Sequence, residues 1–146
     1  MHRRMIFKLS ITGMLGGFIL GAGTVAFAGL ADSPWGYYGP ILGKSYRNQA
    51  TVVTGTDHAW AYTYVETTGQ ENLPAGYMGA LARLYKSGTL CSQQGYTYND
   101  TALAGFSEAT FVNCGRGTYY SYGVTKAYNG NGYNAVFTFQ SPSQNY

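Results

Sequence analysis

Charged residues are scarce in this 146-residue chain, and their scarcity excludes several classes of partner. Lys, Arg, Asp and Glu make up 10% of the residues, with nine cations against six acids. Three of the cations, Arg3, Arg4 and Lys8, lie in the N-terminal segment, so the rest of the chain has no net charge. A chain without net positive charge lacks the long-range attraction that draws proteins to nucleic acids or anionic membranes. We therefore expect no nucleic-acid partner.

Cysteine and histidine are rarer still. Cys91 and Cys114 are the only cysteines, and no histidine lies near either of them. That spacing does not match a zinc site, whereas a single pair of cysteines in an exported chain typically forms a disulfide. His58 is the only histidine beyond the N-terminal segment. We therefore expect a Cys91–Cys114 disulfide, no metal site and no cofactor.

The sequence also lacks a recognisable catalytic motif. Asp57 and His58 are adjacent, but no Gly-x-Ser-x-Gly elbow accompanies them. No Asp-x-Asp-x-Asp-Gly loop indicates a calcium site. The acids beyond the N-terminal segment are scattered: Asp32, Asp57, Glu66, Glu71, Asp100 and Glu108. We expect that the protein is not an enzyme, with a hydrolase that uses Glu66 and Glu108 as the remaining catalytic alternative.

The N-terminal 28 residues have the order of a secretory signal peptide. A basic head in residues 2–8 precedes an apolar, glycine-rich stretch that ends with Ala26-Phe27-Ala28. Ala26 and Ala28 are the small residues that signal peptidase requires at positions −3 and −1, so they predict cleavage after Ala28. The paired arginines also suit the twin-arginine export route, which is the alternative to the general secretory pathway. We expect residues 1–28 to be a signal-peptide helix and the mature protein to be extracellular.

A retained membrane anchor is the rival interpretation of this segment. The uncharged run over residues 9–31 is long enough to span a bilayer. Its glycines lower its hydrophobicity, however, and no basic cluster follows it, since the next cation is Lys44. We therefore expect no membrane span after processing.

In the rest of the chain, the dominant pattern is one in which every second residue belongs to the same face, as in a β-strand. Residues 58–66 place Trp60, Tyr62 and Tyr64 on one face of a strand, where we expect them to fill the core. Residues 77–86 fit a helical stripe or a strand, and the turn residues around them favour a strand. Asn-Gly repeats at 129–132 separate two further β-prone runs. The pattern predicts an all-β fold, an antiparallel β-sandwich or small barrel of six to eight short strands.

One domain is expected at this length. Prolines and glycines in residues 29–48 predict an extended N-terminal arm, and residues 49–146 a single β-sandwich domain. We expect residues 141–146 to fray.

Aromatic residues are the strongest positive feature. All 15 tyrosines and both tryptophans lie beyond residue 28. Two adjacent strand residues cannot both point inward, so Tyr37-Tyr38 and Tyr119-Tyr120 each expose at least one ring. Exposed rings with neutral neighbours suit sugars, protein partners or membrane interfaces. The candidate binding residues are Trp35, Tyr37, Tyr38, Tyr119, Tyr120, Tyr122, Tyr128 and Tyr133.

Residues 35–53 carry a family resemblance. Trp-Gly-Tyr-Tyr-Gly is followed, from Ser45, by Ser-Tyr-Arg-Asn-Gln-Ala-Thr-Val-Val. This tract resembles the mature start of lactococcin 972-type bacteriocins, which implies an exported β-sandwich that acts on the cell envelope. The cysteine pair departs from that prototype. Residues 74–85 and 117–141 look like parts of small exported bacterial proteins with no assigned role.

These observations lead to one expectation and one alternative. We expect a secreted, non-catalytic bacterial protein that binds cell-wall or extracellular polysaccharide, or an envelope protein, through the candidate aromatic residues. A secreted, lactococcin 972-like bacteriocin is the alternative.

Overall fold

The computed structural model describes residues 29–112 and 114–146, and these residues form thirteen strands. The signal peptide expected over residues 1–28 lies outside the described residues. Every strand pairing is antiparallel, and no helix occurs among the described residues. The prediction of an all-β, antiparallel fold is therefore confirmed at that level.

Five strands form a first layer, in the order β1-β3-β4-β9. The fifth strand, β2, also pairs with β3, beside β1 on the same edge. They are β1 (Gly29–Asp32), β2 (Gly36–Ile41), β3 (Lys44–Thr54), β4 (Ala59–Thr67) and β9 (Gly105–Val112). The long strand β3 pairs with β4 from Tyr46↔Thr67 to Thr54↔Ala59. Its other edge is shared by β1 and β2, each of which covers one end of β3.

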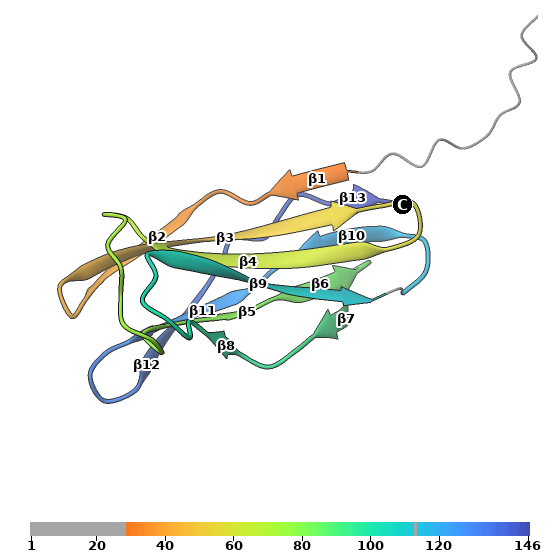
Figure 1. The fold of residues 1–146 in the computed structure, drawn as a ribbon. Coiled ribbons are helices and arrows are strands. Elements are labelled where there is room, and N and C mark those ends of the chain that lie inside the picture. The colour runs from red at the N-terminus through yellow and green to blue at the C-terminus, as the bar shows by residue number, and fades with distance from the viewer. Residues whose placement is uncertain (1–28, 113) are drawn as a thin grey trace, which may run out of the picture.

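The remaining strands form two four-stranded sheets, β13-β10-β6-β7 and β12-β11-β5-β8. They are β5 (Met78–Leu81), β6 (Arg83–Lys86), β7 (Thr89–Gln93), β8 (Thr97–Tyr98), β10 (Thr118–Ser121), β11 (Val124–Tyr128), β12 (Tyr133–Phe137) and β13 (Gln144–Asn145). β5 leads directly into β6 across Ala82, and β10 leads into β11 across Tyr122 and Gly123. The two sheets therefore continue each other as a second layer beneath the first (Figure 1).

Small inward residues build the core between the layers. Strand alternation buries Ala59, Ala61, Thr63 and Val65 of β4. The second layer buries its own alternate residues: Met78, Ala80, Ala82, Leu84, Tyr119, Ser121, Thr125 and Ala127. The hydrophobic residues among these belong to two clusters, each of which contains side chains from both layers. The first layer thus packs against the central strands of the second, while the edge strands β7 and β12 have no buried residue.

Close approach of the layers is set where Gly123 faces Thr63. A Cβ atom on Gly123 would lie 1.9 Å from Thr63 Oγ1, so any larger residue there must push the layers apart. Hydrogen bonds then cross the same interior. The Asn48 amide donates a hydrogen bond to Thr125 Oγ1 at 2.9 Å, and the hydroxyl groups of Ser92 and Thr110 are hydrogen-bonded to each other at 2.7 Å. These bonds offset the cost of burying polar groups.

The predicted disulfide is present. Cys91 of β7 and Cys114, which lies between β9 and β10, are bonded with their Cα atoms 6.3 Å apart. Both side chains pack against the core cluster that contains Leu84 and Tyr119. The bond therefore joins the edge of the second layer to the crossing between β9 and β10.

Several sequence expectations are corrected by the structure. Residues 77–86 are extended as predicted, although Ala82 divides them into β5 and β6. The strands outnumber the expected six to eight because long runs are divided and short edge strands are added. Residues 29–48 are not a separate arm, since they form β1, β2 and the start of β3. Residues 141–146 do not fray, because Ser141 is buried and β13 pairs with β10.

Gly123→Ala is expected to lower the free energy of unfolding by about 2 kcal/mol, the usual cost of overpacking a tight contact. Gly132→Ala is the matched control, since no atom lies within 4 Å of the added Cβ. Chemical denaturation of both variants measures the difference. Equal stabilities would show that Gly123 does not limit the distance between the layers.

Cys91→Ser with Cys114→Ser is expected to lower the free energy of unfolding by about 3 kcal/mol, because the bond restricts the unfolded chain. Denaturation with and without reductant measures this effect. The double variant should not respond to reductant, whereas the natural protein should lose a similar amount of stability. A natural protein that is insensitive to full reduction would contradict the assignment.

Candidate functional site

The outward surface of the second layer carries many aromatic residues, and it is called the aromatic face here. Because Met78, Ala80, Ala82 and Leu84 point inward, the alternate residues of β5 and β6 point outward. The same alternation turns the even-numbered residues of β10 and β11 outward. The residues whose side chains alternate onto this face are Tyr77, Gly79, Leu81, Arg83, Tyr85, Tyr96, Tyr98, Tyr120, Tyr122, Val124, Lys126, Tyr128, Tyr133 and Phe137. Gly79, Leu81 and Val124 are buried beneath their neighbours, and the others are partly or largely exposed.

Five tyrosines form a chain of touching rings at one end of this face, here called the tyrosine cluster. Tyr77 and Tyr128 lie 5.0 Å apart between ring centroids, and Tyr128 and Tyr133 lie 5.7 Å apart. Tyr98 continues the chain at 5.0 Å from Tyr133, and Tyr96 follows at 6.3 Å from Tyr98. Tyr133 also donates its hydroxyl to Gly76 O at 2.8 Å and remains 40% exposed.

Lys126 lies among these rings. Its ammonium group is 3.8 Å from the centroid of Tyr96 and about 6 Å from those of Tyr98 and Tyr133. It also donates a hydrogen bond to the hydroxyl of Tyr98 at 3.3 Å. Stacking of a cation on ring faces in this way is favourable and holds the ammonium in place.

Gly79 makes this arrangement possible. In the sheet it stands between Tyr98 on β8 and Lys126 on β11. A Cβ atom on Gly79 would lie 2.8 Å from the Tyr98 ring and 3.2 Å from Cβ of Lys126. The absent side chain therefore leaves the space across which the Tyr98 ring reaches Lys126.

Four more rings form a second group on the same face, here called the stacked group. Tyr85 and Tyr120 are parallel, with centroids 5.1 Å apart, and Tyr122 stacks on Phe137 at 5.5 Å. Arg83 places its guanidinium 5.7 Å from the Phe137 ring, which is 54% exposed. Leu81 and Val124, a paired position on β5 and β11, lie between this group and the tyrosine cluster.

The first layer has aromatic residues on its own outer surface. Trp60, Tyr62 and Tyr64 are partly exposed there, which corrects the expectation that they fill the core. The core takes the opposite face of β4 because that face carries the small residues. Trp35 lies 4.4 Å below the Arg47 guanidinium. Hydrogen bonding with Tyr37, and next with Glu66, raises the pKa of Arg47 above its ordinary value.

Two of the candidate tyrosines pack against the core, Tyr119 fully buried and Tyr38 partly buried. Tyr119 is fully buried, donates its hydroxyl to Gly115 O and stacks on Tyr146. Tyr38 stacks on Tyr46 and shares a hydrogen bond of 3.1 Å with Thr125 Oγ1. Burial raises the pKa of both phenols to about 12. Tyr119 is therefore removed from the candidate binding residues.

The remaining candidates fall on two surfaces. Tyr128 and Tyr133 join the tyrosine cluster, and Tyr120 and Tyr122 join the stacked group. Trp35 and Tyr37 belong to the first layer and do not reach the aromatic face, and Tyr37 is 67% exposed. Sequence reasoning missed part of the aromatic face: Tyr77, Tyr85, Tyr96, Tyr98 and Phe137. The alternation in residues 77–86 contained the signal for two of these residues.

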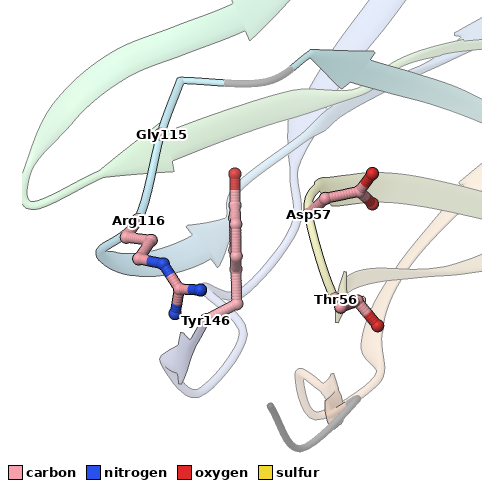
Figure 2. Close-up of a pocket in the computed structure, with 5 residues that line it drawn as sticks. All are labelled: Thr56, Asp57, Gly115, Arg116 and Tyr146. Carbon is pink, nitrogen blue, oxygen red and sulfur yellow. The ribbon is translucent and has the colours of Figure 1, made fainter. Parts of the chain in front are cut away.

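Three surface depressions lie near these residues. One, of about 260 Å³, is lined by Tyr77, Tyr128 and Tyr133 of the tyrosine cluster with Ala75 and Gly76. Another, of about 440 Å³, lies against Tyr37, Tyr38 and Tyr46 on the first layer. Figure 2 shows a third, of about 220 Å³, where the Tyr146 ring stands between the side chains of Arg116 and Asp57. The first of the three is continuous with the aromatic face.

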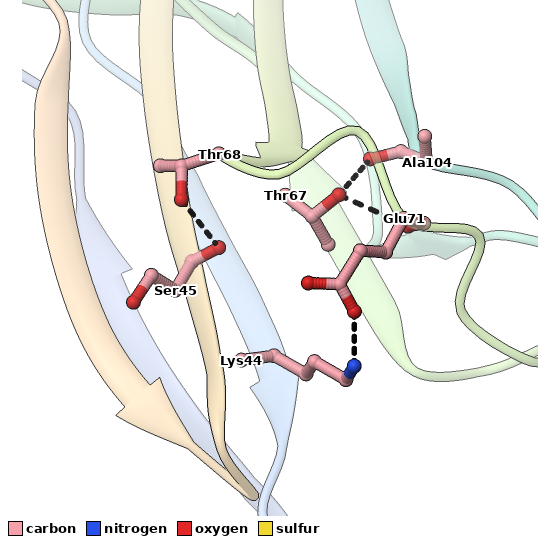
Figure 3. A network of polar contacts seen from close by, with 6 residues as sticks. All are labelled: Lys44, Ser45, Thr67, Thr68, Glu71 and Ala104. Atoms are coloured by element: carbon pink, nitrogen blue, oxygen red, sulfur yellow. Dashed lines mark hydrogen bonds and ion pairs between the residues drawn. The ribbon is translucent and has the colours of Figure 1, made fainter.

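The polar network in Figure 3 has a structural role. Thr67 donates its hydroxyl to Glu71 O at 3.0 Å and lies 3.3 Å from Ala104 O, while Lys44 pairs with the Glu71 carboxylate. Thr68 donates to Ser45 O at 3.4 Å. These contacts hold the loop after β4 against β3 and the chain that enters β9. No reactive group is left over in them.

No group of three or more His, Cys, Asp or Glu side chains that could hold a metal occurs in residues 29–112 and 114–146. Over the same residues, no helix has the length and hydropathy needed to cross a bilayer. Comparison with protein families, curated proteins and solved structures finds no match to this chain. Function must therefore be argued from the aromatic face itself.

The two buried phenols predict a loss of stability at alkaline pH. Their pKa is about 12 in the folded protein but returns to the ordinary 10.0 on unfolding, so the unfolded state releases protons first. Stability is complete below about pH 10 and falls as the pH rises to about 12. Tyr38→Phe with Tyr119→Phe should flatten this decline, measured by denaturation across that range. An identical decline in the double variant would contradict the prediction.

Proposed function

We propose that this chain is a secreted, non-catalytic β-sandwich protein that binds polysaccharide of the cell envelope or extracellular matrix through the aromatic face. The observation that carries the proposal is that two groups of partly exposed rings, the stacked group and the tyrosine cluster, lie on the same face of the second layer. Sugar rings present C–H faces that stack on aromatic rings, and hydroxyl groups that accept hydrogen bonds from phenols.

The dimensions of this face favour a linear polymer. Tyr120 and Tyr128 are eight residues apart along the β10–β11 run, which corresponds to about 26 Å at the rise of a strand. Rings spread over that length can contact several consecutive sugars, whereas a single small ligand would use only one depression. The neutral neighbours on the edge strand, Asn134 and Ala135, are exposed and leave the rings accessible.

The rings are also held in position before any ligand arrives. Tyr133 is fixed by its hydrogen bond to Gly76 O, and Tyr98 by its contact with Lys126. Neighbouring tyrosines restrict each other through ring contacts. Rigid rings lose little conformational freedom on binding, which supports affinity for a ligand that offers only weak individual contacts.

Tyr133→Ala is expected to weaken polysaccharide binding about tenfold, equivalent to about 1.4 kcal/mol, because it removes the most exposed ring of the cluster. Tyr62→Ala is the matched control, since Tyr62 is a stacked, partly exposed tyrosine on the first layer. Binding is measured by affinity electrophoresis with soluble polysaccharides and by sedimentation with purified peptidoglycan.

Tryptophan fluorescence identifies the surface that is used. Trp35 and Trp60 both lie on the first layer, so binding at the aromatic face should leave their emission unchanged. A change in tryptophan emission on binding would place the ligand on the first layer instead. Absence of retention on every polysaccharide would overturn the proposed function, and growth inhibition of related strains by the purified protein would favour the bacteriocin.

A further inference from the structure

The neutrality of the chain beyond residue 28 conceals a separation of charge between its two layers. Residues 78–98 and 114–146 contain every strand of the second layer and carry four cations but no acidic side chain. The cations are Arg83, Lys86, Arg116 and Lys126. All six acids beyond residue 28 lie in residues 29–77 and 99–112, which supply the first layer and its loops. The second layer is therefore positive and the first is negative.

The cations of the first layer are already neutralised. Lys44 pairs with Glu71, and Arg47 pairs with Glu66. In the second layer, Lys86 donates to Cys114 O at 2.6 Å, and Arg116 shares its depression with Asp57. These two cations lie at the end of the layer and are not part of the aromatic face.

Arg83 and Lys126 are the cations of the aromatic face, and neither has a carboxylate partner among the described residues. Arg83 lies beside the Phe137 ring in the stacked group, and Lys126 lies over Tyr96 in the tyrosine cluster. Each group of rings thus contains one cation. Asp100, which is exposed two residues after Tyr98, is the acid closest to this face in sequence.

We infer that the polysaccharide bound by the aromatic face is acidic and carries carboxylates on its sugar rings. This inference rests on the proposed function and adds the ligand's chemical class. The ammonium of Lys126 lies only 3.8 Å from the centroid of the Tyr96 ring. A ligand that stacks on these tyrosines and also reaches the ammonium must hold its negative charge directly beside a sugar ring, as a uronic acid does.

The spacing of the two cations suits a repeating polymer. Lys126 is paired with Gly79, and Arg83 lies four residues beyond Gly79 on the same face. Four residues of strand span about 13 Å, so the two cations can engage carboxylates on two different sugars of one chain. Two well-separated charge contacts strengthen binding more than either contact alone, because the second forms within the same complex.

Polygalacturonate and its highly methyl-esterified form provide the test, because they share one sugar backbone and differ in charge. The purified mature protein should bind polygalacturonate at least about tenfold more tightly than the ester. Added salt should weaken binding to polygalacturonate and leave binding to the ester unchanged, because only the charged contacts are screened.

Lys126→Gln and Arg83→Gln should each weaken binding to polygalacturonate about three- to tenfold. Lys44→Gln is the matched control, because it removes the same charge from the first layer. Lys126→Arg should restore most of the affinity, which separates loss of charge from disturbance of the rings. Circular dichroism and denaturation of each variant show whether it is folded.

Each outcome bears on a different claim. Equal affinity for the two polymers, or Lys44→Gln as damaging as Lys126→Gln, would overturn the inference while the proposed function stands. Binding to neither polymer nor to other polysaccharides would overturn both. Binding of single-stranded oligothymidylate as tight as that of polygalacturonate would show a general polyanion site and overturn the preference for an acidic polysaccharide.

Discussion

The narrow interior between the two layers is the constraint on which the rest of the structure depends. Its inward positions are mostly Ala, Thr, Ser and Gly, and Gly123 meets Thr63 with no space for a methyl group. Layers that approach so closely leave no room for large rings between them. Tyr119 and Tyr46 are buried at the ends of this interior, each within one of the two core clusters, whereas most other rings are directed outward.

The placement of small side chains inside and most aromatic rings outside explains both how the protein is held together and why its surface is aromatic. A core of small side chains buries little apolar area for each residue, so hydrogen bonds across the interior and the Cys91–Cys114 bond become more important to stability. The rings on the outside stack on each other instead, which shields part of their area from water. The part of their area that remains exposed forms the surface to which we assign the proposed binding of polysaccharide.

The charged residues are distributed unequally between the two aromatic surfaces. The acids and their paired cations lie with the first layer, while Arg83 and Lys126 stand among the rings of the second. This combination of aromatic rings and isolated cations is the basis of the proposed preference for sugar rings that carry carboxylates. The opposite face offers tryptophan and tyrosine, but its two cations are already paired with acids. One small domain thus presents two aromatic surfaces of different electrostatic character.

Alternation, turn residues and the cysteine pair were sufficient to predict an antiparallel, disulfide-bonded β protein, because these are local properties of a strand and its turns. Alternation also required one ring of each adjacent tyrosine pair to face outward. It could not decide which face of a strand is buried, so Trp60, Tyr62 and Tyr64 were expected inside and Tyr119 outside. That choice depends on the partner layer, as does the assembly of Tyr77, Tyr96, Tyr98, Tyr128 and Tyr133 from four separate segments. The residues beyond 28 have no net charge, and the separation of their charges between the two layers likewise emerges only when the chain is folded, because distant segments contribute to each layer.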